Sequence, residues 1–380
     1  MSVQIKNIPF HKAAIGEEEI NEVVDTIKSG WLTMGPKTIE FEKQFADYFG
    51  VEYAISMNSA TACLHLALKA IGLNEGDEVI LPTTTFVSTA EVVTYFNAIP
   101  VLCDIREEDH NIDVSKIESL ITNKTKAIIP VHFSGIPCDM DTIHEIAKKF
   151  DLKVIEDAAH ALPSEYNGKK VGGLSDITCF SFYATKTLAT GEGGMATTNN
   201  EEYALSMKRN RLHGISKDAW NRYSKRGSWF YEVVDNGYKY NMTDIAASFG
   251  LVQLKKLNDL NKKRTKIAKK YTSAFANHPK ISILTPPKNT SSSWHLFVIK
   301  VEKRDEMMQR LKDAGIGSSL HFIPVHCHPY YQKQFRYDCT QFKTANKVFN
   351  QSISIPIFPD LSDSDVDFII ETILNNVDVL

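Results

Sequence analysis

The sequence lacks the features that mark several classes of protein. Its 380 residues contain no apolar run close to the roughly 20 residues that a membrane-spanning helix needs. The six cysteines include no CxxC pair, which argues against a disulfide framework or a cysteine zinc site and favours reduced core cysteines. The 43 basic and 46 acidic residues leave no basic field for nucleic acid. The N-terminal stretch MSVQIK has no signal-peptide core, so we expect a cytoplasmic protein.

The glycine patterns of nucleotide-binding loops are also missing. Asn58–Ala62 lies between an expected strand and an expected helix, but it has none of the glycines of a dinucleotide fingerprint or a Walker loop. Its small residues and the helix N-terminus would let an anion approach backbone N–H groups. An ordinary helix N-cap explains the same residues, and on this loop alone it is the better interpretation. Binding of NAD or ATP is therefore disfavoured.

What the sequence does contain is a regular alternation of short apolar and amphipathic segments. Such alternation predicts βαβ units, and so an α/β fold whose mostly parallel sheet is covered by helices on both faces. Strands are expected at residues 53–57, 78–81, 100–103, 126–131, 153–155, 177–183 and 195–198. Helices are expected at residues 16–28, 39–49 (with Thr38 as N-cap), 60–71, 86–96, 114–121 and 140–150.

The C-terminal part of the sequence predicts a smaller α+β domain. A long helical pattern from Thr243 to Phe275 links it to the large domain, and residues 214–236 form an aperiodic loop whose length suggests a functional role. Further strands are expected at residues 294–301 and 353–356, and further helices at 305–314, 344–349 and 364–374. We therefore expect a large, ligand-binding domain at residues 1–250 and a small C-terminal domain at residues 251–380.

Two predicted strands lead to side chains that could take part in catalysis. The strand Ile177–Tyr183 leads to Lys186 and to a loop with three glycines in four residues. A lysine in this position suits an amine that forms a Schiff base, although most lysines after strands are ordinary surface residues. The preceding strand in the sequence ends in Asp157, on the same expected edge of the sheet, and this aspartate can cap a helix or hold a proton on a pyridine nitrogen. The anion loop, the aspartate and the lysine together are the set that pyridoxal 5'-phosphate requires.

Longer motifs carry a resemblance along nearly the whole chain. They are Phe41-Glu42, Tyr48–Gly50, Gly76–Ile80, Ile129–His132, Glu156–His160, Phe180–Phe182, Gly191–Gly194, Leu212–Gly214 and Tyr240–Asp244. With these motifs the chain resembles the sugar aminotransferases of the DegT/DnrJ/EryC1/StrS family, a branch of the fold-type I pyridoxal phosphate enzymes. It looks closest to members that aminate UDP-4-keto-pentoses for lipid A modification. The shared features are Asn58–Ala62, Gly237–Asn241 and Trp294–Phe297.

The resemblance implies a role for each matching residue. Lys186 is the Schiff-base lysine and proton shuttle, and Asp157 is the partner of the pyridine nitrogen. The other cofactor-binding positions are Ala60 and Thr61 in the phosphate loop, Ser181 as a phosphate-binding hydroxyl, Phe86 on the ring face, His160 near the ring hydroxyl and Asn241 at the phosphate of a neighbouring subunit. Many members have Trp where this chain has Phe86. Plain core packing of Phe86, and a turn or cap role for Asn241, are the alternatives from sequence alone.

A histidine cluster near the C-terminus is a candidate for the sugar–nucleotide pocket. His321 and His326, with Tyr330, are the proposed substrate-binding residues. Histidines this close together also fit a metal site, but no cysteine or carboxylate ligand accompanies them at the usual spacing. We therefore expect no metal.

The resemblance also implies the reaction. It would move the amino group of L-glutamate to a nucleotide-linked keto-sugar, a 4-keto sugar being favoured, for a cell-surface polysaccharide or lipopolysaccharide. A homodimer with shared active sites is implied by Asn241. Some relatives are dehydratases with histidine in place of the lysine, and Lys186 argues against that outcome here. A keto-sugar dehydratase, a non-catalytic regulatory relative and a nicotinamide-dependent sugar dehydrogenase are the alternatives, the last disfavoured by the missing glycine fingerprint.

Overall fold

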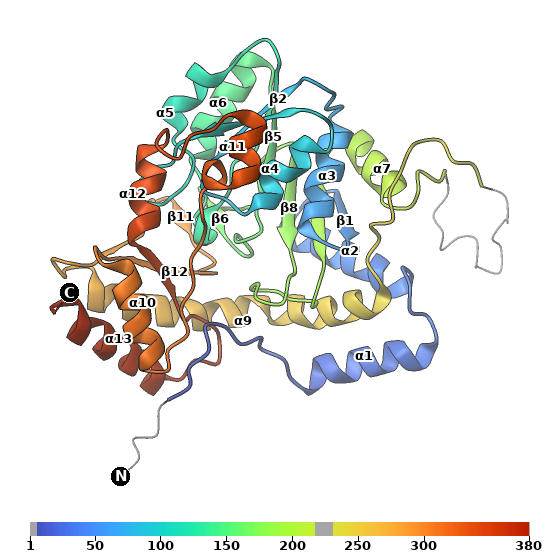
Figure 1. Ribbon diagram of the computed structural model, residues 1–380. Coiled ribbons are helices and arrows are strands. Elements are labelled where there is room, and N and C mark those ends of the chain that lie inside the picture. Colours follow the sequence, from blue (N-terminus) through green and yellow to red (C-terminus); the bar gives the residue numbers. More distant parts are fainter. Residues whose placement is uncertain (1–5, 217–230, 380) are drawn as a thin grey trace.

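A seven-stranded sheet forms the centre of the protein, in a computed structural model that describes residues 6–216 and 231–379 (Figure 1). Its strands, in spatial order, are β1 (Tyr53–Met57), β9 (Gly194–Thr198), β8 (Ile177–Ser181), β5 (Lys153–Asp157), β4 (Thr125–Ile128), β2 (Glu78–Pro82) and β3 (Ile99–Cys103). Only β9 runs against its neighbours, and the other pairs are parallel. The predicted α/β fold with a mostly parallel sheet is confirmed.

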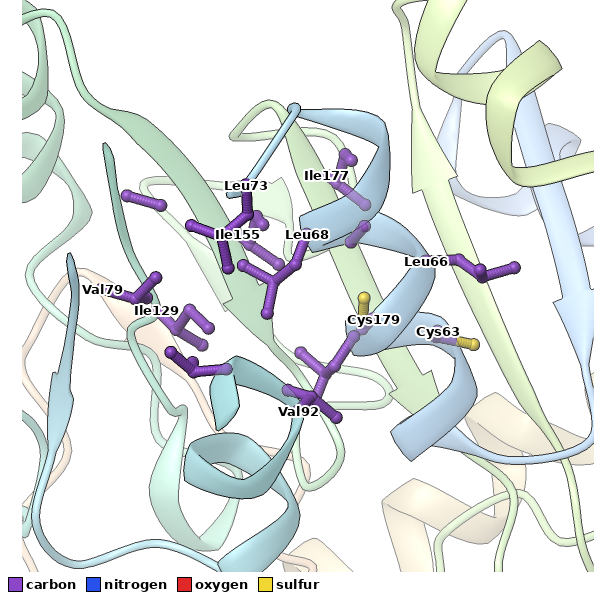
Figure 2. Close-up of a cluster of buried hydrophobic side chains, with 14 of the residues drawn as sticks. Cys63, Leu66, Leu68, Leu73, Val79, Val92, Ile129, Ile155, Ile177 and Cys179 are labelled. Atoms are coloured by element: carbon purple, nitrogen blue, oxygen red, sulfur yellow. The ribbon is translucent and has the colours of Figure 1, made fainter. Parts of the chain in front are cut away.

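Helices cover both faces of this sheet, because successive strand residues point to opposite sides. Ile155 and Cys179 pack against the layer of α3 (Ala60–Ala70), α4 (Val87–Thr94) and α7 (Glu201–Asn210). Figure 2 shows Leu68 and Val92 of this helical layer lying over the central strands. Val154 and Phe180 face the other layer. That layer consists of α2 (Pro36–Phe49), α5 (Val114–Ile117), α6 (Met140–Phe150) and α9 (Asp244–Phe275).

The small C-terminal part is built on the far half of α9 (Figure 1). Its sheet pairs β10 (Ser282–Ile283), β12 (Phe297–Lys300) and β13 (Ser352–Ile355), all antiparallel. Its helices are α10 (Arg304–Asp313), α12 (Lys343–Gln351) and α13 (Asp363–Val377), and α11 (Pro329–Phe335) packs back on the large core. A third sheet joins β6 (Glu165–Tyr166), β7 (Lys169–Lys170) and β11 (Thr290–Ser291). Of the helices named, α7 and α11 were not predicted.

The change from large to small core falls inside α9. Leu251 and Leu257 pack with the large part, whereas Ile267 and Tyr271 pack with the small one. Ile8, near the start of the chain, also belongs to the small core and forms a bridge with Ile316. Packing therefore places Ile8, as well as the C-terminal elements, in the small part. A single division of the chain at residue 250 would place Ile8 in the large part. Fourteen residues of the predicted loop 214–236, numbers 217–230, lie outside the described residues.

Helix α1 (Glu17–Ser29) forms as predicted, but its apolar face stays uncovered. Ile20 and Ile27 are 49% and 52% exposed, whereas Glu19 is buried. The reason is that α1 is held on α9 by polar contacts, in which the Glu19 carboxylate accepts hydrogen bonds from Gln253 and Lys256. No helix in the described part of the chain is long and apolar enough to cross a membrane.

Helix α2 begins earlier than the sequence suggested, because its cap comes from a distant residue. The expected cap, Thr38, lies inside the helix, which starts at Pro36. The buried Asp244 carboxylate accepts the backbone N–H groups of Gly35 (2.7 Å) and Thr38 (3.0 Å) and the Thr38 hydroxyl (2.6 Å). These bonds satisfy N–H groups that the helix itself leaves free. Asp244 thereby ties the start of α2 to the start of α9.

Loss of this distant cap is expected to destabilise the whole fold. Asp244→Ala leaves buried N–H donors without an acceptor, so the free energy of unfolding should fall by about 2–4 kcal/mol. Urea titration measures the change. Asp259→Ala on the same helix removes only an exposed pair with Lys262 and should leave the free energy of unfolding essentially unchanged. Equal effects of the two substitutions would contradict the proposed cap.

Candidate active site

A cavity of about 580 Å³ opens where strands β5 and β8 end and helix α3 begins. This is the carboxyl edge of the parallel strands, where open α/β sheets bind ligands. The cavity brings together eight of the residues singled out from the sequence. They are Ala60, Thr61, Phe86, Asp157, His160, Ser181, Lys186 and His321. Asn241, His326 and Tyr330 lie outside it.

Lys186 stands in a tight turn after β8, with its backbone N–H bonded to the Tyr183 carbonyl (2.8 Å). The side chain points into the cavity, where burial disfavours the charged amine. Burial therefore lowers the pKa of Lys186 from 10.5 to about 8, although the Asp157 carboxylate acts in the opposite direction. At pH 7 about a tenth of this amine is then uncharged, far more than for an ordinary lysine, and the uncharged amine is the state that attacks an aldehyde or accepts a proton.

Asp157 is the last residue of β5 and is buried at the floor of the cavity. One carboxylate oxygen accepts the Thr89 hydroxyl (2.8 Å) and the other the Ala159 N–H (3.1 Å). Burial raises the pKa of Asp157 above its ordinary value, while these hydrogen bonds and the Lys186 amine act in the opposite direction. The carboxylate keeps acceptor capacity for a further donor, since each carboxylate can accept about four hydrogen bonds.

The opposite end of the cavity is formed by the start of α3 and the glycine-rich loop. Ser59 caps the helix by accepting the Ala62 N–H (3.1 Å), which leaves the first N–H groups of the helix available to an anion. A Cβ on Gly194 would lie 2.6–2.7 Å from the backbone of Ser59 and Ala60. Glycine is therefore required here for strand β9 to approach the anion loop. Ser181 also faces this space.

Phe86 is 56% exposed and lies at the mouth of the cavity, directly before α4. Such exposure is incompatible with the alternative that Phe86 only fills the core. Its ring lies 5.8 Å from that of Phe322, which also lines the cavity. The two rings give the entrance an apolar edge.

Three histidines form one wall of the cavity, and one of them, His295, was not singled out from the sequence. His160 accepts the Ser134 N–H at Nδ1 (3.3 Å), and its ring lies 4.4 Å from that of His295. His321 Nδ1 lies 2.9 Å from the Ser354 hydroxyl. Within the described part of the chain, His295 Nδ1 has no hydrogen-bond partner. The motif that contains His295 was noted, but nothing in it indicated that the side chain would face the site.

These histidines are neutral at physiological pH. Burial, with the nearby Lys186 amine, lowers the pKa of His321 to about 4, and the pKa values of His160 and His295 lie well below the ordinary range for the same reasons. Neutral imidazoles donate and accept hydrogen bonds without binding anions as charges do. The wall therefore suits hydroxyl and carbonyl groups of a sugar better than phosphates.

His326 and Tyr330, predicted to bind substrate, do not line this cavity. His326 is fully buried, with the Thr83 hydroxyl 2.6 Å from Nδ1 and the Asn346 side-chain oxygen 3.1 Å from Nε2. It anchors the end of β2, after which the chain carries Thr85 and Phe86 into the site. Tyr330 is 56% exposed on the first turn of α11, edge-on to Tyr331. His326 and Tyr330 lie close to His321 in the sequence, but no sequence signal marks the turn that separates them from it in the structure.

Asn241 lines a second cavity of about 640 Å³ beside the exposed face of α1. Its side-chain oxygen is buried without a hydrogen-bond partner among the described residues, and its amide donates to the Met242 carbonyl (3.2 Å). Glu192 lines both cavities, so the two spaces adjoin. Elsewhere, in residues 6–216 and 231–379, no group of three or more His, Cys, Asp and Glu side chains is arranged to hold a metal ion.

An amine, a strand-end carboxylate and open helix N–H groups match the three ends of pyridoxal phosphate: its aldehyde, its ring nitrogen and its phosphate. On this sheet edge they define a fold-type I pyridoxal phosphate enzyme. A sequence model of the DegT/DnrJ/EryC1/StrS aminotransferase family matches residues 13–374, and the chain belongs to that family. Its cofactor is pyridoxal phosphate, and it is a sugar aminotransferase by family and by structure.

Individual relatives agree with this placement. The spore coat polysaccharide biosynthesis protein SpsC of Bacillus subtilis is 49% identical over 382 residues, which cover 98% of each chain. Spr1654 of Streptococcus pneumoniae, provisionally assigned as a sugar aminotransferase, is 38% identical and has been solved in PMP and PLP forms. The match to the PMP form has a TM-score of 0.93 and covers 98% of this chain and 100% of that chain. PseC of Helicobacter pylori, an aminotransferase of pseudoaminic acid biosynthesis, is 30% identical with a TM-score of 0.92, covering 99% and 100%.

The lowered pKa of Lys186 gives a direct test of the site. In the apo-protein, the rate of adduct formation with pyridoxal phosphate should rise with pH through a midpoint near 8, because only the uncharged amine reacts. Asp157→Asn removes the carboxylate that raises this pKa, so its midpoint should be lower than that of the wild type. Absorbance measures the rate, and borohydride trapping followed by mass spectrometry places the adduct. A midpoint near 10.5, or an adduct on another lysine, would contradict the proposed electrostatics.

Proposed function

We propose that this protein transfers the amino group of L-glutamate to a nucleotide-linked keto-sugar, a 4-keto sugar being favoured. The proposed product is an amino sugar for a cell-surface polysaccharide or lipopolysaccharide, made in the cytoplasm. The observation that carries the proposal is the Lys186 amine, with a pKa of about 8, beside Asp157 in a cavity walled by neutral histidines. The roles of SpsC in spore coat polysaccharide and of PseC in pseudoaminic acid biosynthesis support a sugar substrate.

Several side chains of the cavity have a part in the proposed reaction. Pyridoxal phosphate supplies an electron sink and carries the amino group between the two substrates. Lys186 Nζ holds the cofactor at rest, takes the proton from the donor's Cα once displaced, and returns a proton to the sugar carbon in the second half. Asp157 keeps a proton on the ring nitrogen. His160 is proposed to lie near the ring hydroxyl.

The remaining residues bind and orient. The N–H groups of Ala60 and Thr61 and the Ser181 hydroxyl are proposed to hold the phosphate. All three residues line the cavity, and Ser181 pairs with Gly194, which packs against the start of α3. Phe86 covers the ring face, and its exposure at the cavity mouth leaves it free to do so. His321, as predicted, and also His295 are proposed to contact the sugar. His326 and Tyr330 are not assigned to substrate.

The proposed active unit is a homodimer whose sites are shared. The second cavity is bordered by exposed apolar side chains of α1, among them Ile20 and Val24. Contiguous apolar surface of this kind marks an interface, and a second copy of the chain would cover it. Asn241 in this cavity offers a buried side-chain oxygen without a partner among the described residues. We propose that it reaches the cofactor phosphate of the neighbouring subunit.

Product analysis tests the reaction. Purified protein is incubated with L-glutamate and a panel of nucleotide 4-keto and 3-keto sugars, and mass spectrometry identifies amino sugars and 2-oxoglutarate. Lys186→Ala should lower the turnover by at least about a thousandfold, since the nucleophile and the proton shuttle are lost together. Lys262→Ala, a change at an exposed lysine of α9, should leave turnover unchanged. Loss of a sugar hydroxyl without consumption of glutamate would instead indicate a dehydratase. Absence of turnover with every keto-sugar would indicate a regulatory role.

Complementation tests the shared site. Lys186→Ala and Asn241→Ala are each expected to be poorly active as homodimers. When the two chains are co-expressed, each mixed dimer has one site with both native residues, provided that Asn241 serves the neighbour. Random pairing should then restore about a quarter of wild-type activity, because half of the dimers carry one intact site of two. No restoration, despite mixed dimers isolated with two affinity tags, would show that Asn241 acts within its own subunit.

A further inference from the structure

A chain of two buried hydroxyl groups leads to the Asp157 carboxylate. Thr89, on the first turn of α4, places its hydroxyl 2.8 Å from one Asp157 oxygen, and the Thr85 hydroxyl lies 2.7 Å from that of Thr89. Both threonines are at most 1% exposed. Neither residue was singled out from the sequence, and the proposed reaction does not use them.

Only one arrangement of protons satisfies this chain while Asp157 is ionised. A carboxylate can only accept, so the single proton of Thr89 must point to Asp157. The Thr89 oxygen is then free to accept, so the Thr85 hydroxyl donates to it. The chain therefore runs from Thr85 through Thr89 to Asp157, and each member fixes the orientation of the next. A protonated Asp157 would have no such need of Thr89 as a donor.

The hydroxyl chain is held from outside the cavity. The hydroxyl of Thr83, two residues before Thr85, lies 2.6 Å from Nδ1 of the buried His326, and the Thr83 carbonyl accepts the Val325 N–H (2.8 Å). The Thr89 N–H bonds to the Phe86 carbonyl (3.2 Å) at the start of α4. The loop between β2 and α4 is thus fixed at both ends, which is what keeps the two hydroxyl groups in line.

We propose that Thr89, oriented by Thr85, is a positioning residue that keeps Asp157 ionised and directed at the ring nitrogen of the cofactor. The inference rests on the proposed roles of Asp157 and Lys186. Burial alone would favour the neutral carboxylic acid, which cannot hold a proton on a pyridine ring as a counter-ion does. Hydrogen bonds to a charged group are stronger than those between neutral groups, so the loss of one donor matters.

Other groups that face Asp157 stay the same when the threonines are changed. They are the Lys186 amine after β8, His132 after β4 and the Cys179 thiol on β8. His132 is itself held by the Glu156 carboxylate (2.8 Å). Any change in the ionisation of Asp157 in a threonine variant is therefore due to the hydroxyl chain.

Thr89→Val tests the proposal because it keeps the shape of the side chain and removes the hydroxyl. Cofactor labelled with ¹⁵N at the ring nitrogen reports the protonation of that atom by NMR, independently of turnover. In Thr89→Val the ¹⁵N signal should move toward the unprotonated position, and kcat should fall about tenfold to a hundredfold, as expected for a lost hydrogen bond to a charge. KM for both substrates should stay within about threefold, because substrate contacts are intact.

Three further variants complete the design. Thr89→Ser keeps the donor and should restore both readouts. Thr94→Val is the matched control on the same helix, since among the described residues the Thr94 hydroxyl bonds to the Glu91 carbonyl alone (2.7 Å). Thr85→Val should give a smaller shift in the same direction, and it supplies the test if Thr89→Val does not fold.

The outcomes separate this inference from the proposed function. A wild-type protein in which borohydride traps no adduct on Lys186 would refute the proposed function. A wild-type adduct, with the ¹⁵N signal and kcat of Thr89→Val and Thr85→Val equal to those of the wild type, would refute only the role of the hydroxyl chain.

Discussion

The site depends on burying one amine beside one carboxylate at the edge of a parallel sheet. Neither charge is stable in an apolar interior alone, and each lowers the cost of burying the other. Strands β5 and β8 run side by side in the same direction, so Asp157 and the turn that carries Lys186 emerge together. The alternation of β5 decides which carboxylate faces the cavity. Glu156, one residue earlier, points into the protein and accepts hydrogen bonds from His132 and Thr178 instead.

The sequence alone predicted the features that depend on local apolar patterns and on the common direction of parallel strands. Apolar periodicity predicted the strands of the sheet, and the edge rule brought Asn58–Ala62, Asp157 and Lys186 to one place. The sequence was not sufficient where a residue acts across the fold. The start of α2 is set by Asp244, which lies 206 positions after Thr38 in the sequence, and no local signal marks that contact.

The histidines show the same limit. His321 and His326 belong to one short motif, and pattern alone gave them one function. In the structure, a turn places His321 in the cavity and buries His326 against Thr83 and Asn346. His295 reaches the cavity from the start of the small part, which the sequence could not align with β5. The side chains that surround a reacting group come from many segments, and only the packing of those segments selects them.

Under the proposed function, the cavity of a single chain has too few positive charges for its substrates. Among the described residues that line it, Lys186 is the one lysine or arginine, and the three histidines are neutral. Glutamate and a nucleotide diphosphate bring several negative charges, which proteins bind with lysine, arginine or helix N-termini. The N-terminus of α3 is already proposed to hold the cofactor phosphate, so further cations must come from beyond this wall. The adjoining cavity contains the exposed apolar side chains of α1 and an Asn241 oxygen that has no partner among the described residues. Under the proposal, a second subunit would lie here and supply these cations. The uncovered helix and the scarcity of cations therefore both support the proposed homodimer, in which the neighbouring chain would meet the substrate charge and cover the apolar surface.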